Sequence, residues 1–428
     1  MNISKNSILD EDKFLFITTI LLSALPAALL IGTLISNSVL FLICLSFLLH
    51  CFYKKDFRVF KNKISLILYF FWLGLIINLI FSEIPQNSIG RVLGFARFLI
   101  LSISIFYIFN LRNILFKDII LKSWAILFLI VIVDLFIEFI FGKNILGYSS
   151  DYIGRLASFT GDELKIGNFF LAFSFIFIAT VYNKIKDIKI LFILILIITI
   201  LGFLIGERAN FIRLLFIANL FIFFLCVFKK RIKIFLLTNL VALSIFLSLI
   251  SYDRVYNDGK KVDTYNDKYY IRYLKEFNRV LDKPFLEYLK HDTRHGHHYY
   301  TAINIFKEHK LTGVGLKNFR EFSFEKRFKP EFSDHNKFAT HPHQIYFEIL
   351  SEMGILGVVF FIATFGTILI HIFRTNLREK SLLGLSASSF VLITFLPLIP
   401  SGSFFTSFGA TLFWMNFGVM CDVSNKFK

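Results

Sequence analysis

Long apolar runs alternate with short basic stretches along most of the chain, and one polar segment interrupts this pattern. Runs such as residues 188–206 carry almost no charge and have the length of helix, about 20 residues, that crosses roughly 30 Å of hydrocarbon. Lipid offers the backbone no hydrogen-bond partners, so such runs should form helices. They lack the period of two that the strands of a membrane barrel show. The pattern therefore predicts an all-α polytopic membrane protein.

About twelve transmembrane helices are expected, together with one large and partly helical loop. We expect the first nine helices within residues 1–251, the loop at residues 252–342 and the last three helices within residues 343–428. Within the loop, residues 269–281 and 300–309 have amphipathic patterns typical of helices. The expected spans are 14–34, 37–53, 64–82, 92–110, 119–141, 166–183, 188–206, 209–228, 234–251, 344–373, 381–400 and 405–421.

The charges of the short loops indicate the orientation of the chain in the membrane. Lys and Arg are enriched in the cytoplasmic loops of membrane proteins, and in this chain basic loops alternate with loops that are nearly uncharged, such as residues 35–36 and 401–404. We therefore expect both termini in the cytoplasm and residues 252–342 outside, which in a diderm bacterium is the periplasmic side of the inner membrane. The basic loops are residues 54–63, 111–118, 184–187, 229–233 and 375–380.

The net charge of +17 is first explained by this arrangement. In a membrane protein an excess of Lys and Arg follows from the positive-inside rule and requires no nucleic-acid partner. Lys and Arg also outnumber Asp and Glu within residues 252–342, and a basic outside loop suits an anionic ligand. None of the four cysteines lies in that loop, so neither a disulfide nor a CxxC metal site is expected there.

Eight of the ten histidines lie in the large loop and at its exit. Histidine exchanges protons near neutral pH, so this segment concentrates acid–base chemistry on the outside. His343 follows a proline at the expected start of a membrane helix, where the helix dipole favours the neutral imidazole that acts as a base. The alternative for His343 is a surface histidine that caps the helix. The eight histidines are His291, His295, His297, His298, His309, His335, His341 and His343.

Two further patterns of the loop give only weak indications of a bound cofactor. His295, His297 and His298 form an HxHH tract, a pattern that binds zinc or copper in some proteins. No His-Glu-x-x-His pattern accompanies it, and we predict no metal. Gly313 and Gly315 lack the third glycine of a dinucleotide-binding fingerprint. They are expected to form a turn that lets the backbone approach the membrane surface.

Arg208 lies in a tight turn between two apolar spans. A charge at that depth is costly and normally has a partner or a ligand, and Glu207 is the candidate partner. The guanidinium fork also matches phosphate oxygens better than an ammonium group does. The alternative is that the guanidinium of Arg208 extends to the lipid headgroups without binding a ligand.

Four local patterns follow one another along the chain. They read GRLASFTGDE at residues 154–163, GERANF at 206–211, GVGLKNF at 313–319 with an arginine upstream, and HPHQIYFEILSEMGILG at 341–357. In this order, on a chain with about twelve spans, they resemble the superfamily of O-antigen ligases and O-antigen polymerases. These are polytopic bacterial glycosyltransferases that use lipid-linked glycans. The resemblance implies a GT-C-like fold.

The chain departs from the family pattern at three points. The first motif lacks the family's inner glycine, and Gln344 stands where the family usually has Asn. Tyr299 or Tyr300 stands where a tryptophan is usual after the loop arginine. Arg294 is that arginine by its spacing, and Arg272 is the other candidate.

The resemblance implies the transfer of a glycan from undecaprenyl pyrophosphate. Arg208 and Arg294 would bind the donor pyrophosphate, and His343 would act as general base on the acceptor hydroxyl. Attack from the opposite face would invert the anomeric centre, without a metal, a cofactor or a nucleotide sugar. Membrane lipids are expected partners and nucleic acid is not. The possible helpers are Arg155, Arg272, Glu207 and His341.

The resemblance leaves the acceptor open. A ligase transfers the whole O-antigen to lipid A-core, a polymerase joins lipid-linked repeat units, and a third reaction of the superfamily uses a protein hydroxyl. The large basic loop favours the ligase, because the core acceptor is phosphorylated.

A transporter of lipid-linked sugars is the alternative from another class of protein. It would need ionisable residues inside the spans and inverted repeats. No internal repeat is found, and the charged residues within spans are few: Asp134 and Glu138, with Arg97, Arg213 and Lys122 near span ends. We therefore favour the glycosyltransferase.

Overall fold

The computed structural model describes residues 12–150, 154–163, 165–233, 235–237, 239–240, 244, 248, 280–282, 284–292, 294–330 and 339–423. Every regular element within these residues is a helix and none is a strand. The predicted all-α class is confirmed for this part of the chain.

The amino-terminal half consists of apolar helices joined by short loops. They are α2 (Lys13–Ile31), α3 (Thr33–Lys54), α4 (Lys63–Ile80), α5 (Pro85–Gly94), α6 (Ala96–Phe109), α7 (Leu115–Phe141), α8 (Ile166–Ile185), α9 (Ile188–Leu204) and α10 (Arg208–Phe228).

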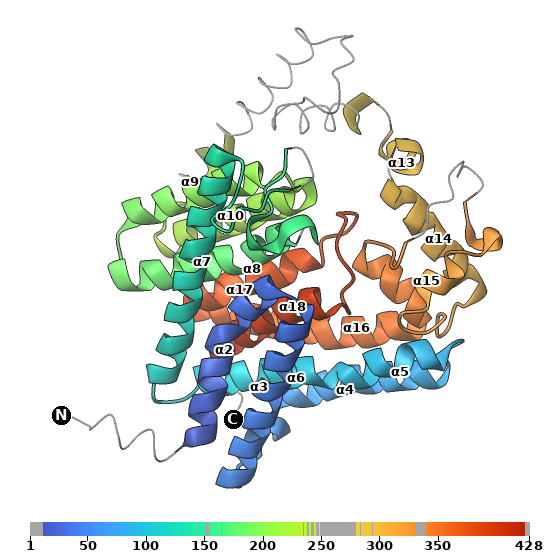
Figure 1. Cartoon of the computed structure of the whole chain (residues 1–428), viewed down its shortest axis with the longest axis horizontal. Coiled ribbons are helices and arrows are strands. Elements are labelled where there is room, and N and C mark those ends of the chain that lie inside the picture. The colour runs from blue at the N-terminus through green and yellow to red at the C-terminus, as the bar shows by residue number, and fades with distance from the viewer. Residues whose placement is uncertain are drawn as a thin grey trace.

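The carboxyl-terminal half contains short helices of the large loop, followed by three longer apolar ones. The loop helices are α13 (Phe285–Glu287), α14 (Arg294–Glu308) and α15 (Phe319–Phe322), and the longer helices are α16 (Ile345–Arg378), α17 (Leu382–Thr394) and α18 (Ser407–Met420). In Figure 1 the gold α14 and the orange α15 lie beside the first part of α16.

Eight helices in the described part of the chain are long and apolar enough to cross a membrane. One of them is formed by α5 and α6 together, and the apolar α9 and α17 are shorter than the rest. Apart from the span expected at 234–251, which lies mostly outside the described residues, every expected span coincides with an apolar helix. The polytopic class is therefore supported, and the count of twelve stays a prediction.

The helix ends follow from local capping. The side chains of Asp12, Asn62 and Ser381 accept a hydrogen bond from a backbone N–H of the first turn of α2, α4 and α17, which satisfies a donor that has no partner within the helix. At the other end, Gly142 and Lys186 stop α7 and α8 in the left-handed conformation, with φ of 73° and 59°.

Aromatic side chains fill the core around α18. This helix packs against α6, α17 and α8, and its residues from Ala410 onward are buried. The ring of Phe413 meets those of Phe404 and Phe365 edge-to-face, with centroid distances of 4.8 and 5.7 Å, an arrangement that aromatic rings favour. Phenylalanine side chains thus make up much of this core.

Two segments that the charge pattern predicts to be cytoplasmic contact each other at one end of the molecule. The Lys117 ammonium at the start of α7 lies 2.6 Å from the Asp422 carboxylate, just after α18. The orientation of the chain in the membrane stays a prediction.

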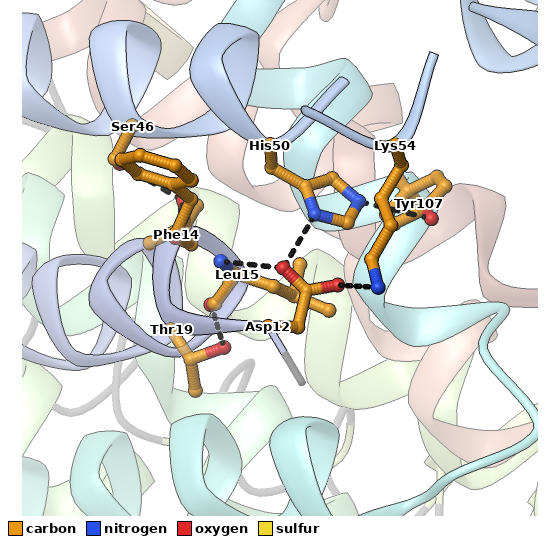
Figure 2. Close-up of polar contacts among 9 residues, drawn as sticks. Asp12, Phe14, Leu15, Thr19, Ser46, His50, Lys54 and Tyr107 are labelled. Carbon is orange, nitrogen blue, oxygen red and sulfur yellow. Dashed lines mark hydrogen bonds and ion pairs between the residues drawn. The ribbon is translucent and has the colours of Figure 1, made fainter. Parts of the chain in front are cut away.

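A buried polar cluster ties α2, α3 and α6 together at that end (Figure 2). The Asp12 carboxylate lies 2.8 Å from Nδ1 of His50 and 3.8 Å from the ammonium of Lys54. Nε2 of His50 lies 3.1 Å from the hydroxyl of Tyr107. The cluster fixes the first residue before α2 against two other helices.

α16 is broken at Gly354, where φ is 62° and ψ is −159°. This conformation is almost confined to glycine. A Cβ atom at this position would lie 2.5 Å from the carbonyl carbon and oxygen of Leu311. The main chain of the large loop thus occupies the place beside Gly354 that a side chain would take.

Residues 310–315 hydrogen-bond to both sides of the break in α16. The N–H groups of Ile355 and Leu356 donate to the carbonyls of Lys310 and Leu311 at 2.9 and 3.1 Å. In return, the N–H of Val314 donates to the carbonyl of Ser351 at 3.0 Å. Groups freed by the break are thereby satisfied, which a membrane helix requires.

The GVG segment forms the expected turn, and its backbone packs closely against α16. Gly313 has φ of 64°, and a Cβ there would lie 2.4 Å from the carbonyl carbon of Glu352. The Asn78 amide of α4 joins the same two segments, donating to the carbonyls of Thr312 and Glu352 at 2.7 and 3.1 Å.

Gly354→Ala should destabilise the protein by at least about 2 kcal/mol, because alanine cannot adopt this conformation without strain and its Cβ would overlap Leu311. Gly366→Ala in the same helix is the matched control, since its Cβ would meet nothing closer than 3.9 Å. Thermal unfolding in detergent measures the difference. Equal melting temperatures for the two variants would contradict the close packing of residues 310–315 against Gly354.

Candidate functional site

His343 lies two residues before α16 in a left-handed conformation, with φ of 60°. The next residue, Gln344, caps the helix through its side-chain oxygen, which accepts from Tyr346 N–H at 2.8 Å. The carbonyl of His343 accepts a hydrogen bond from Ser401 N–H at 2.7 Å. A left-handed conformation costs a non-glycine residue about 1–2 kcal/mol, so neighbouring contacts must hold His343 in place.

Three further imidazoles surround that of His343. Its ring centroid lies 4.1 Å from the ring of His341, 5.1 Å from that of His295 and 5.5 Å from that of His298. We call these four residues the histidine cluster. It joins the loop helix α14 to the entrance of α16.

Helical geometry divides the HxHH tract of α14. His295 and His298 are three residues apart and therefore share one helix face, the face toward His343. His297 is buried, and its carbonyl accepts from the hydroxyl of Thr301. Among the residues that the structure describes, no three His, Cys, Asp or Glu side chains gather as metal ligands do.

Burial favours the neutral imidazole in two residues of the cluster, His341 and His343. Burial lowers the pKa of His343. Burial, followed by repulsion from His343 and His298, lowers the pKa of His341 to about 3. A neutral imidazole can accept a proton, so His343 has the protonation state of a general base at neutral pH.

Tyr299 supports the cluster from α14. Its ring stacks on Phe347 of α16, with centroids 4.5 Å apart and planes 20° apart. The hydroxyl of Tyr299 and Nε2 of His341 are buried without a hydrogen-bond partner among the described residues. Such atoms usually indicate a missing ligand or water.

Arg91 of α5 is a charge near the cluster that the sequence analysis did not single out. Its positive charge contributes to the low pKa of His341, and it also attracts the buried carboxylates of Glu348 and Glu352. Arg91 forms no hydrogen bond or salt bridge with the residues described. The signal in the sequence was an arginine in an expected outside segment, where basic residues are depleted.

The first two motifs pack against each other. Leu156 N–H donates to the carbonyl of Ile205 at 3.3 Å. Gly206 has φ of 77°, and a Cβ there would lie 2.2 Å from the carbonyl oxygen of Gly154. Arg155 therefore lies directly beside the turn that precedes Arg208.

Glu207 and Arg208 do not pair as expected. Within the described part of the chain, the Glu207 carboxylate accepts from Gly167 N–H at 3.2 Å and from the Asn210 amide at 2.5 Å. Burial raises the pKa of Glu207, while hydrogen bonds and the charges of Arg155 and Arg213 oppose this. Arg208 is exposed as the first residue of α10, because neighbouring residues at a helix start point in different directions.

Arg213 is the buried arginine of α10, with 4% of its surface exposed. Its Nη2 donates to the carbonyls of Ile399 and Pro400 at 3.2 and 2.9 Å, and its Nη1 donates to Asn210 at 3.3 Å. From the sequence it was only a charge near a span end, because its partners lie far along the chain.

The remaining candidate arginines are described only in part. Arg294 is the first residue of α14, but its side chain lies outside the described residues, and Arg272 lies outside them altogether.

The two acids of α7 hold the first motif. Asp134 accepts from the Ser158 hydroxyl at 2.5 Å and from Ile145 N–H at 2.8 Å. Glu138 accepts from the N–H groups of Ala157 and Ser158 at 3.0 and 2.7 Å. These charges fasten a loop, and this explains their presence in an apolar helix without a transport pathway.

The site is thus a cluster of four imidazoles at the start of a broken helix, and two of these imidazoles have a lowered pKa. The family model of O-antigen ligases matches residues 193–362, which include Arg208, His343 and Gly354. This match supports the O-antigen ligase and polymerase superfamily, as the four motifs predicted. The family implies the processing of lipid-linked glycans. No curated protein matches the chain.

Acid should destabilise the protein through His341. Its folded pKa of about 3 lies below the unfolded value of about 6.5, so the stabilisation is complete above pH 6.5 and is lost as the pH falls below it. At pH 5 the loss should be about 2 kcal/mol.

Melting temperatures in detergent at pH 7.5 and 5 would measure this effect. His341→Asn should lose less stability on acidification than the wild type. The control His371→Asn removes an exposed histidine of α16 and should behave as wild type. Equal losses in His341→Asn and wild type would rule out His341 as the acid-sensitive group.

Proposed function

We propose that the protein is an O-antigen ligase-like glycosyltransferase of the bacterial inner membrane, which moves a glycan from undecaprenyl pyrophosphate to lipid A-core on the periplasmic side. The observation that carries this proposal is His343, whose burial favours the neutral imidazole and whose backbone is held in a strained conformation beside α16. The family match supports the class of reaction.

In the proposed step, the oxygen of an acceptor hydroxyl attacks the anomeric carbon of the donor. The imidazole of His343 takes the hydroxyl proton as the glycosidic bond forms. The bond between the anomeric carbon and the pyrophosphate oxygen breaks, and its electron pair leaves with the pyrophosphate. Attack opposite the leaving group inverts the anomeric centre.

Arginines would stabilise the charge that develops on the leaving pyrophosphate. We assign Arg208 and Arg294 to the donor pyrophosphate, because a guanidinium can bind two phosphate oxygens at once. The positive charge of Arg91, which contributes to the lowered pKa of His341, supports an anionic ligand at this place. The proposed helpers are Arg155, Arg272, Glu207 and His341.

An O-antigen polymerase is the alternative. It would use the same donor and the same attack, and only the acceptor would differ. The basic large loop favours the phosphorylated lipid A-core. A transporter of lipid-linked sugars is less well supported, since Asp134 and Glu138 are engaged in holding residues 157–158.

Replacement of His343 should abolish transfer. His343→Asn is the suitable variant, because asparagine tolerates the left-handed conformation but supplies no base. Its rate should fall by about 10²–10⁴-fold. His371→Asn, at the far end of α16, is the control. The gene would be deleted in its host, complemented with each variant, and the surface polysaccharide separated on a gel.

The gel also separates the candidate functions. Lipid A-core without O-antigen, together with long lipid-linked polymer, would identify a ligase. Core with a single repeat unit would identify a polymerase. An unchanged profile in the deletion strain would exclude both. Full complementation by His343→Asn would exclude His343 as the base.

The pH dependence of the rate should carry the signature of His343. Since burial lowers its pKa in the unliganded protein, the base stays unprotonated to lower pH, and the acid limb of the kcat/KM profile should lie below the usual value of about 6.5. Purified protein and donor lipid extracted from the deletion strain allow this measurement. A midpoint at or above 6.5 would be the opposite result.

A further inference from the structure

The loop between α17 and α18 carries the hydrogen bond that holds His343. Residues 399–404, here called the clamp loop, contribute Ser401 N–H, which donates to the carbonyl of His343 at 2.7 Å. Without that bond, the left-handed conformation of His343 would lose its direct support. The geometry of the clamp loop therefore determines where the imidazole of His343 lies.

Two buried charges hold the clamp loop from different helices. Arg213 of α10 donates to the carbonyls of Ile399 and Pro400 at 3.2 and 2.9 Å. Glu348 of α16 accepts from the hydroxyl of Ser403 and, at 2.9 Å, from the N–H of Phe404. Ser401 lies between these two attachments.

Burying these two ionisable side chains costs free energy, and hydrogen bonds to the clamp loop offset that cost. Arg213 is 4% exposed and Glu348 is 2% exposed. Within the described residues neither forms a salt bridge. Each makes hydrogen bonds to neutral groups instead, mostly those of the clamp loop, while Nε of Arg213 has no partner among the described residues. A buried charge needs such partners, so both side chains impose a definite geometry on this loop.

Contacts on the other side of His343 continue the same attachment. The Tyr346 hydroxyl donates to the carbonyl of Phe395 at 2.6 Å, and the Gln344 amide lies 3.5 Å from the carbonyl of Leu396. The segment that begins α16 is thus fastened to the end of α17 as well as to the clamp loop.

We propose that Arg213 and Glu348 are positioning residues, which fix the backbone of His343 through the clamp loop and so aim its imidazole at the acceptor hydroxyl. This inference rests on the proposed function, in which His343 is the base. A misplacement of about 1 Å can cost 10²-fold in rate, so a small shift of the clamp loop is sufficient.

The first test compares substitutions of Glu348. Glu348→Ala removes both acceptors, and kcat should fall about 10–100-fold while KM for the donor stays within about 2-fold. Glu348→Gln keeps one acceptor oxygen and should retain more activity. Glu379→Gln, just after α16, makes the same chemical change away from the clamp loop and is the matched control. The substrate is lipid-linked glycan extracted from the deletion strain.

Arg213→Lys tests the other attachment. Lysine keeps the charge but lacks the fork that reaches two carbonyls, so kcat should again fall with KM unchanged. Arg378→Lys at the end of α16 is the control. A lower melting temperature with wild-type kcat per folded molecule, in Glu348→Ala or Arg213→Lys, would show a merely structural role and overturn the proposal.

Ser401 offers a test on a single hydrogen bond. Ser401→Pro removes the N–H that donates to His343, whereas Ser401→Ala keeps it. The proline variant should lose at least about 10-fold more kcat than the alanine variant. This pair decides the question if the charge variants do not accumulate in the membrane. Equal kcat for the two variants would overturn the proposal.

A double-mutant cycle separates this proposal from the proposed function. If positioning acts through His343, adding Glu348→Ala to His343→Asn should cause little further loss. Full activity of His343→Asn alone would overturn the proposed function. An inactive His343→Asn combined with wild-type kcat in Glu348→Ala and Arg213→Lys would overturn only the positioning role. Fully additive losses of activity in the double variant would also overturn only the positioning role.

Discussion

The structure depends on the main-chain hydrogen bonds between residues 310–315 and the break of α16 at Gly354. A broken membrane helix leaves N–H and C=O groups without partners, which is costly away from water. The loop supplies these partners and is itself fixed by them. Since α14 ends at Glu308, just before this segment, the same contact brings α14 to the start of α16. The histidine cluster is a consequence.

Around His343, the buried side chains of Arg213 and Glu348 form hydrogen bonds with main-chain, amide and hydroxyl groups rather than with opposite charges. Burial lowers the pKa values of the nearby imidazoles of His341 and His343. This combination suits proton transfer, because a base must be both unprotonated and correctly aimed. The arginines that remain near the site suit a ligand of opposite charge.

Particular residues show how far sequence reasoning reached. His343 was singled out because a histidine after a proline at a span start is a local pattern, and its role stays a prediction. The Glu207–Arg208 pair was wrong, because Gly167, forty positions earlier, approaches Glu207 instead. The HxHH tract was recognised, but only the helix of α14 decided that His295 and His298 face His343. The GVG turn was expected, but its packing against the break of α16 was not.

The sequence by itself determined the helical class and the approximate places of the spans, because the apolarity of about twenty consecutive residues sets their preference for hydrocarbon. It also determined the family resemblance, since the four motifs are local. Only the tertiary structure decided that Arg213 and Glu348 hydrogen-bond to one loop. They belong to α10 and α16, and no local pattern states which buried side chains share a neighbour. That depends on how the helices pack.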